Sequence, residues 1–402
     1  MKKKLFFLTA VFIVFLFSAC FSNIVIEPPP SHTRVAAYIR CTWGNWSADQ
    51  IQGEYLTDII LAFTNIDSDF SSLTGVNDLW SDWNRIEELK KLHPHLRIHI
   101  SVGGWSADYF SQMSRDETKR KTFITNCINL IKKRNLDGID IDWEYPVGPS
   151  YWYAPGAVES PVNSSGNPIT VSLQDRVNYI KLLEELRSAL NKLSRETKKY
   201  YYLSTCVPAD EWFISRNDVI AAASIVDSIK LMAYDYSGSW TDAVYHANLH
   251  PAYPGGWSTS SALEAYLKAG VPAHKIMMGM PTYGKEWKGV PPGDNPNLPG
   301  LNMNASGVRG RDLGYSQTIK KYLDVNSGFT RYWDDTAKQA ILYNPDLDSG
   351  TWVCYPDKEQ IELIIAYSKE KGLNGFFYWE WYWDQDADLL SVMHKEAVRS
   401  IP

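Results

Sequence analysis

The chain has 402 residues, of which 45% are hydrophobic, 21% charged and 13% aromatic. These fractions are typical of a globular protein with a large core, and they exclude a disordered or a collagen-like chain. Forty basic and 46 acidic residues give a net charge of −6. Because proteins that bind duplex nucleic acid usually carry a basic excess, we expect no nucleic-acid partner. The 16 tryptophans indicate either stacking on sugar rings or a Trp-rich core, since Trp offers large flat faces.

The N-terminus has the features of an export signal. Three lysines at positions 2–4 precede an apolar run over 5–19, which has the length of a signal peptide and is short for a membrane span. Two small residues before Cys20 resemble a bacterial lipoprotein cleavage site, with ordinary cleavage nearby as the alternative. We expect a signal peptide over 1–20 and a linker over 21–33. The protein would be exported, either secreted or lipid-anchored at the bacterial cell envelope, with a lipid on Cys20 as its one membrane contact.

After residue 33, short apolar runs alternate with helical patterns. The expected strands are 35–39, 58–63, 97–102, 138–143, 201–206, 228–234, 276–280 and 375–378. The clearest helical period covers 172–198, and further helices are expected over 357–371 and 385–399. Strand–helix alternation predicts a parallel sheet, so we expect an α/β fold. Eight strands in a chain of this length predict a closed (β/α)8 barrel.

One stretch interrupts this alternation. Between Gly284 and Asp357 the chain is rich in Gly, Pro, Asn and aromatic residues and has no long helical period. That length is too great for a loop in a compact barrel. We therefore expect a small α+β insertion domain over 288–356, between the seventh strand and its helix. The barrel would comprise 34–287 and 357–402.

The most informative segment is the expected fourth strand. Side chains alternate along a strand, so Asp140, Asp142 and Glu144 share one face, while Ile139 and Ile141 share the other. In a barrel the apolar face packs under the helices and the acidic face lines the interior up to the mouth. Three crowded carboxylates cannot all ionise cheaply, so we expect the row to share protons. A protonated Glu144 at the mouth would suit a general acid.

Two other readings of this acidic row are weaker. An edge strand with a solvated face could carry such a row, but a central parallel strand has little solvated face. A metal site lacks accompanying His ligands, and the order of the acids does not match a calcium loop. The five cysteines show no C-x-x-C spacing, so a zinc site is not supported either. We expect no metal and no cofactor.

The pattern D-x-x-D-x-D-x-E over 137–144 resembles the signature of the family 18 glycoside hydrolases, the chitinases. Other segments are similar to family segments in the same order, namely S-V-G-G-W at 101–105, M-A-Y-D at 232–235, M-P-T-Y-G at 280–284 and G-F-F-Y-W at 375–379. The stretch after the seventh strand resembles the family's insertion domain. The resemblance extends from about Arg34 to the C-terminus.

The resemblance implies a particular mechanism. Most retaining glycosidases use one carboxylate as acid and a second as nucleophile, but family 18 is an exception in which the substrate's own 2-acetamido oxygen attacks. Glu144 would protonate the leaving oxygen and then activate water. Asp142 would hold the acetamido N–H, and Asp140 would share a proton with Asp142. Tyr234 would bind the acetamido carbonyl, and Asp235 would hold the distorted sugar.

The resemblance also implies which aromatic residues contact the glycan. Trp379 would stack under the scissile sugar, and Trp105 and Trp240 would be platforms for neighbouring sugars. Phe63 is a further candidate for the same cleft. Ordinary packing in the core is the alternative for each Trp.

Polar and apolar supports complete the implied site. Ser101 and Tyr38 would support the acids from below, with ordinary hydrogen bonding in the core as the alternative, and Met232 would pack under the sugar or belong to the core. Tyr283 is a candidate substrate contact. Lys285 stands where many relatives carry Arg, and because Lys cannot make a bidentate contact, this subsite departs from the family pattern.

Three functional readings remain. The first is a chitinase, expected to be monomeric and to cleave within chains of chitin or chitooligosaccharides. The second is a hydrolase of another N-acetylglucosamine glycan, such as peptidoglycan or an N-glycan core, and the third is a non-catalytic chitin-binding lectin. The insertion favours the first, because relatives that cleave N-glycans usually lack it. Lectin relatives typically lose the acid, whereas Glu144 is present.

Overall fold

The computed structural model describes Ile26 and residues 33–41, 46–74, 83–105, 107–149, 171–373 and 375–398. The expected signal peptide over 1–20, with Cys20, lies outside the described residues, as does almost all of the expected linker. Within the part that is described, no helix is long and apolar enough to cross a membrane.

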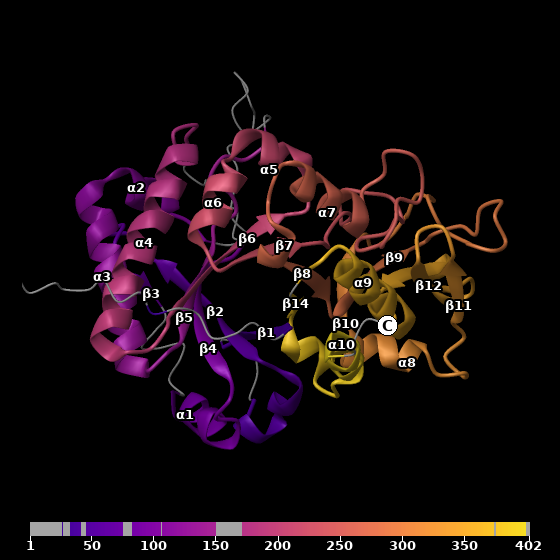
Figure 1. Ribbon diagram of the computed structural model, residues 1–402. Coiled ribbons are helices and arrows are strands. Elements are labelled where there is room, and N and C mark those ends of the chain that lie inside the picture. The colour runs from indigo at the N-terminus through magenta and orange to yellow at the C-terminus, as the bar shows by residue number, and fades with distance from the viewer. Residues whose placement is uncertain are drawn as a thin grey trace, which may run out of the picture.

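Eight parallel strands close into a barrel (Figure 1). Their order around the barrel is β1-β14-β8-β7-β6-β5-β4-β2, and pairing of β1 with β2 closes it. The strands are β1 (Arg34–Arg40), β2 (Asp58–Ile66), β4 (Arg97–Gly103), β5 (Gly138–Asp142), β6 (Tyr202–Pro208), β7 (Ser228–Met232), β8 (Ile276–Pro281) and β14 (Gly375–Trp379). A short β3 (Leu73–Thr74) pairs antiparallel with β2. The predicted (β/α)8 barrel is confirmed.

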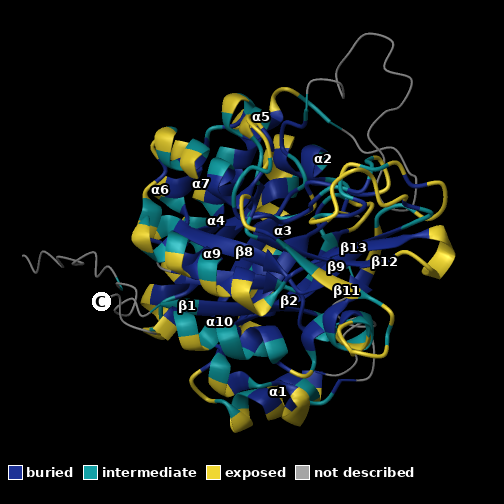
Figure 2. Cartoon of the chain, turned by 90° about the vertical axis from the view of Figure 1, so that its right-hand side faces the viewer, coloured by how far each residue is buried: buried dark blue, intermediate teal, exposed yellow. Residues whose placement is uncertain are grey.

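Helices surround the barrel, with buried faces on the strands and exposed faces outward (Figure 2). They are α1 (Trp83–Leu92), α2 (Phe110–Arg115), α3 (Glu117–Arg134), α4 (Asp175–Thr197), α5 (Glu211–Arg216), α6 (Val219–Ile225), α7 (Thr259–Lys268), α9 (Lys358–Glu370) and α10 (Asp388–Val398). The expected helix over 172–198 begins at Asp175. Ser172 lies in the turn before it, where its hydroxyl accepts a hydrogen bond from the amide of Gln174 at 3.2 Å.

The insertion forms a five-stranded antiparallel sheet beside the barrel, in the order β10-β9-β13-β12-β11 (Figure 1). Its elements are β9 (Tyr283–Lys288), β10 (Arg311–Gly314), α8 (Lys320–Tyr322), β11 (Thr330–Asp334), β12 (Gln339–Asn344) and β13 (Thr351–Tyr355). The sheet takes in β9, and so begins before the boundary expected at residue 288. We call this five-stranded sheet with its loops the lobe.

A single residue, Thr282, links the barrel strand β8 to the first lobe strand β9. Its amide donates to the carbonyl of Trp379 at 2.9 Å. Its hydroxyl donates to the carbonyl of Glu380 at 2.6 Å and accepts from the Glu380 amide at 2.8 Å. The start of the lobe is therefore tied to the end of β14.

Strand β5 has the alternation that the sequence predicts. Ile139 and Ile141 are buried in the core shared with the helices, and the ring of Trp143 stacks on Phe110 of α2 at 5.1 Å. The opposite face of β5 lines the barrel interior. Gly103 on the neighbouring β4 allows this approach, because a Cβ there would lie 1.9 Å from the carbonyl oxygen of Asp142.

Asp58, at the start of β2, is a fully buried charge centre at the N-terminal end of the barrel strands. Arg34 and Arg97 each reach its carboxylate with two nitrogens, at 2.8–3.1 Å and at 2.8 Å. The ring of His99 lies 2.9 Å from the same carboxylate. Burial alone would raise the pKa of Asp58, but Arg34, His99 and Arg97 hold it well below its usual range. The cluster joins β1, β2 and β4.

Candidate active site

Asp140 lies at the centre of the barrel interior and is fully buried. Its carboxylate accepts hydrogen bonds from the hydroxyls of Tyr38 and Ser101, both at 2.8 Å, from the hydroxyl of Ser204 at 2.6 Å, and from the Lys230 ammonium at 2.9 Å. Burial alone would raise the pKa of Asp140, but the Lys230 charge and these donors lower it. Tyr38 and Ser101 therefore lie where the sequence predicts, in contact with the acid row.

Asp142 and Glu144 follow along the row toward the mouth. Burial, and then the charges of Glu144 and Asp140, raise the pKa of Asp142 well above its usual range. Desolvation raises the pKa of Glu144 to about 7, with a smaller contribution from Asp235. The row thus contains one carboxylate with a lowered pKa and two with raised pKa values. The groups in hydrogen-bond contact with the Asp140 oxygens are the hydroxyls of Tyr38, Ser101 and Ser204, the Cys206 thiol and the Lys230 ammonium. The sharing of a proton between Asp140 and Asp142 stays a prediction.

Lys230 on β7 was missed in the sequence. Strand alternation contains the signal, because Lys230 and Met232 share a face, and Ile229 and Leu231 on the opposite face are buried in the outer core. When a lysine occupies an inward-facing position of an apolar strand, its charge is expected to be buried and to need a partner of opposite charge.

Tyr234 and Asp235 lie in the segment after β7. Burial and nearby acidic groups raise the pKa of Tyr234 well above 10, so its hydroxyl remains a hydrogen-bond donor at neutral pH. Asp235 is half exposed and pairs with Lys285 of β9 at 2.9 Å. Lys285 also reaches Asp312 of β10 at 2.8 Å, so it bridges a barrel loop and the lobe. Asp312 was not identified from the sequence.

Trp379, at the end of β14, forms an aromatic floor. Its ring stacks on Phe63 at 5.3 Å and meets the edge of Tyr38 at 5.6 Å. The guanidinium of Arg40 lies 5.4 Å from the Trp379 ring centre and 5.0 Å from that of Trp383. Arg40 and Trp383 were missed, because nothing in the local sequence places either of them beside Trp379.

The remaining candidates differ in exposure. Trp105 and Trp240 are 53% and 68% exposed, so both offer free ring surface. Met232 packs, partly buried, on the apolar cluster inside the barrel. Tyr283 is buried, and the centre of its ring lies 4.7 Å from that of the Trp383 ring.

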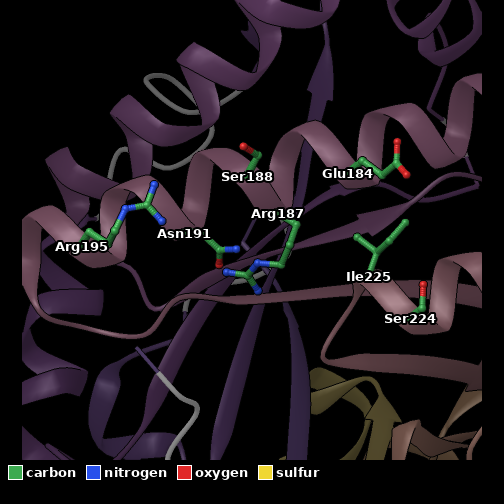
Figure 3. Close-up of a pocket in the computed structure, with 7 residues that line it drawn as sticks. All are labelled: Glu184, Arg187, Ser188, Asn191, Arg195, Ser224 and Ile225. Carbon is green, nitrogen blue, oxygen red and sulfur yellow. The ribbon is translucent and has the colours of Figure 1, made fainter. Parts of the chain in front are cut away.

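A separate open groove lies on the outer face of the barrel, between α4 and α6 (Figure 3). It is lined by Glu184, Arg187, Ser188, Asn191, Arg195, Ser224 and Ile225. None of the acid row or the aromatic floor contributes to it. We therefore assign the candidate active site to the barrel interior and mouth.

Comparison with known proteins identifies the family of the chain. The family model described as "Glycosyl hydrolases family 18" matches residues 36–386. Chitinase A1 from Niallia circulans is 31% identical, over 79% of this chain and 45% of its own length. A probable endochitinase from Caenorhabditis elegans is 29% identical, over 85% of this chain and 56% of its own. The chain thus spans about half the length of these relatives.

A solved structure is similar over almost its whole length. It is described as a glycoside hydrolase family 18 N-acetylglucosaminidase from Paenibacillus barengoltzii, with a TM-score of 0.76 and 28% identity. The match covers 90% of this chain and 99% of that one.

Proposed function

The chain belongs to the glycosyl hydrolases of family 18, and from this premise we propose that it hydrolyses β-1,4 bonds between N-acetylglucosamine units of chitin or chitooligosaccharides. The observation that carries the proposal is the inward row of Asp140, Asp142 and Glu144, in which the pKa of Glu144 is raised to about 7. A carboxyl group with such a pKa holds a proton near neutral pH and can give it to a leaving oxygen.

Glu144 is the proposed general acid. It transfers its proton to the glycosidic oxygen while the substrate's acetamido oxygen attacks the anomeric carbon and the C–O bond breaks. Water then adds to the anomeric carbon of the cyclic intermediate and gives its proton back to Glu144, which restores the sugar with retained configuration. Asp142 would hold the acetamido N–H, and the Tyr234 hydroxyl would donate to the acetamido oxygen.

The sugar contacts follow from the aromatic and charged surfaces. Trp379, backed by Phe63, offers an apolar face to the C–H groups of a pyranose ring. The exposed rings of Trp105 and Trp240 would bind sugars farther along the chain. Asp235, fixed by Lys285, would accept from a sugar hydroxyl.

The test is hydrolysis of the N-acetylglucosamine hexamer, followed by chromatography that separates product lengths and anomers at early times. We expect short oligomers released in the β configuration. Early release of the α-anomer contradicts the retaining route. Binding without cleavage contradicts the hydrolase proposal and favours a lectin.

A second activity is favoured by the neighbour described as an N-acetylglucosaminidase, which is similar over 99% of its length. Such an enzyme would release single N-acetylglucosamine units from a chain end. In the same hexamer experiment, monomer and pentamer as the first products would identify this activity, whereas dimers, trimers and tetramers would identify cleavage within the chain.

Export to the cell envelope is proposed on the leader alone. Its three lysines and its apolar run over 5–19, followed by Cys20, support cleavage before that cysteine and attachment of a lipid to it. Mass spectrometry of the protein from its native host tests this. We expect an N-terminal peptide that begins at Cys20 and carries acyl chains. An unmodified N-terminus elsewhere after the run would indicate secretion without a lipid, and a retained leader would contradict export.

A further inference from the structure

The ion pair between Lys230 and Asp140 lies within the acid row, yet the proposed reaction does not use it. The side chains are 1% and 0% exposed. The Lys230 ammonium lies 2.9 Å from the carboxylate, 3.0 Å from the Ser204 hydroxyl and 5.1 Å from the centre of the Tyr38 ring. A buried ion pair is weak evidence for stability, because desolvation of both charges offsets much of their attraction.

The other charges near Lys230 are already engaged. Asp58 is held by Arg34, Arg97 and His99 at the N-terminal end of the barrel. Burial lowers the pKa of His99, so its ring adds no charge at neutral pH. Among the described residues, Asp140 is the one carboxylate that forms an ion pair with Lys230.

The groups that face Asp140 leave Lys230 as its one close cation in the described structure. They are Tyr38 from β1, Ser101 from β4, Asp142 from β5 itself, Ser204 and Cys206 from β6, and Lys230 from β7. Strands β2, β8 and β14 contribute the apolar Ile60, Met277 and Phe377 to this interior. Burial raises the pKa values of Tyr38 and Cys206, so both remain neutral donors.

We propose that Lys230 is a positioning residue, which holds Asp140 as the permanently ionised member of the acid row and thereby confines the exchangeable protons to Asp142 and Glu144. This role rests on the proposed hydrolase function. Asp140 accepts hydrogen bonds from the hydroxyls of Tyr38, Ser101 and Ser204, from the Cys206 thiol and from the Lys230 ammonium, and these donors favour its ionised form. One oxygen of Asp142 is buried without a hydrogen-bond partner, so Asp142 is free to change its contacts when a substrate N–H arrives.

The consequence for pH dependence has a defined sign. In the wild type, kcat/KM should fall as the pH rises through about 7, because Glu144 loses the proton that it must deliver. We call the fall of kcat/KM at high pH the basic limb of the pH profile. Removing a buried cation raises the proton affinity of the nearby carboxylates. Lys230→Met should therefore move this basic limb to higher pH, by about one unit. Asp140→Asn leaves the cation unbalanced and should move the limb to lower pH.

The decisive experiment compares pH profiles of kcat/KM for the wild type, Lys230→Met, Asp140→Asn and the double variant Lys230→Met/Asp140→Asn. The double variant removes one charge of each sign, so we expect its limb near the wild-type position, even if its rate is low. Ser204→Ala is the matched control, because it removes a neutral donor from the same Asp140 oxygen. Its limb should remain near that of the wild type.

If kcat/KM falls at the same pH in the wild type and in Lys230→Met, the proposal is overturned and Lys230 is a purely structural residue. If Lys230→Met does not fold, Asp140→Asn and the double variant still differ only in Lys230, and coincident limbs in that pair overturn it equally.

A readout without turnover separates this proposal from the hydrolase assignment. If the wild type cleaves no oligomer, the assignment fails, yet urea unfolding still reports the charge state of Asp140. In Lys230→Met this carboxyl is buried without a cation, so its folded pKa exceeds its unfolded value of about 3.9. The urea midpoint of Lys230→Met should therefore lie below that of the double variant, and the difference between the two should widen from pH 4 to pH 7. A constant deficit contradicts the proposal.

Discussion

Replacing Glu144 with Gln should lower kcat on the N-acetylglucosamine hexamer by about 1,000-fold, within the range of 10² to 10⁴ for a general acid–base residue. The amide has the shape of the carboxyl group but no proton to give, so binding of the hexamer should change little. Stopped assays for kcat and calorimetry for the dissociation constant separate the two effects.

The same substitution should not destabilise the fold. The pKa of Glu144 is about 7 in the fold and about 4.3 in the unfolded chain, so between these pH values the unfolded state ionises while the folded state keeps its proton, and the wild type progressively loses stability. Gln removes that loss, so the melting temperature at pH 7 should equal or exceed that of the wild type. Glu264→Gln on the outer helix α7 is the matched control and should keep full turnover. Turnover of Glu144→Gln within about tenfold of the wild type, far below the acid–base range, would assign the proton to another group.

Asp58→Asn should cause the largest loss of stability, about 3–5 kcal/mol, as expected when one partner of a buried charge cluster is removed. Arg34 and Arg97 would then lose their common carboxylate, and His99 its hydrogen-bond partner. Urea unfolding at pH 7 measures the loss. Glu196→Gln makes the same chemical change in an exposed pair with Lys132, and should change stability by less than about 1 kcal/mol.

The pH dependence of unfolding identifies the origin of this loss. The pKa of Asp58 is depressed in the fold, so its contribution is complete above the unfolded pKa of about 3.9 and disappears as the pH falls through the folded value. The difference between the wild type and Asp58→Asn should therefore shrink below about pH 4. A difference that stays constant down to pH 2 would indicate a packing defect instead of a lost charge.

Local alternation made part of this molecule predictable. The ends of the expected strands lie within three residues of those in the barrel. The opposite faces of β5, with Ile139 outward and Asp140 inward, follow from a period of two residues. The same period places Lys230 inward, on the face of β7 that Met232 shares.

The pairings between distant residues were not predictable in this way. Lys285 meets Asp312 only because β9 and β10 pair in one register, and Arg40 meets Glu380 only because β1 and β14 are neighbours in a closed barrel. Such contacts depend on which oxygen or ring a long side chain reaches after the strands have been aligned. A single sequence does not contain that alignment.

The tie at Thr282 has a consequence for how a glycan would be bound. A one-residue link with three hydrogen bonds to Trp379 and Glu380 joins the lobe to the strand that carries the aromatic floor. The lobe and the aromatic floor are thus held in a fixed relation at this link, so that less conformational entropy is lost when a glycan binds to both.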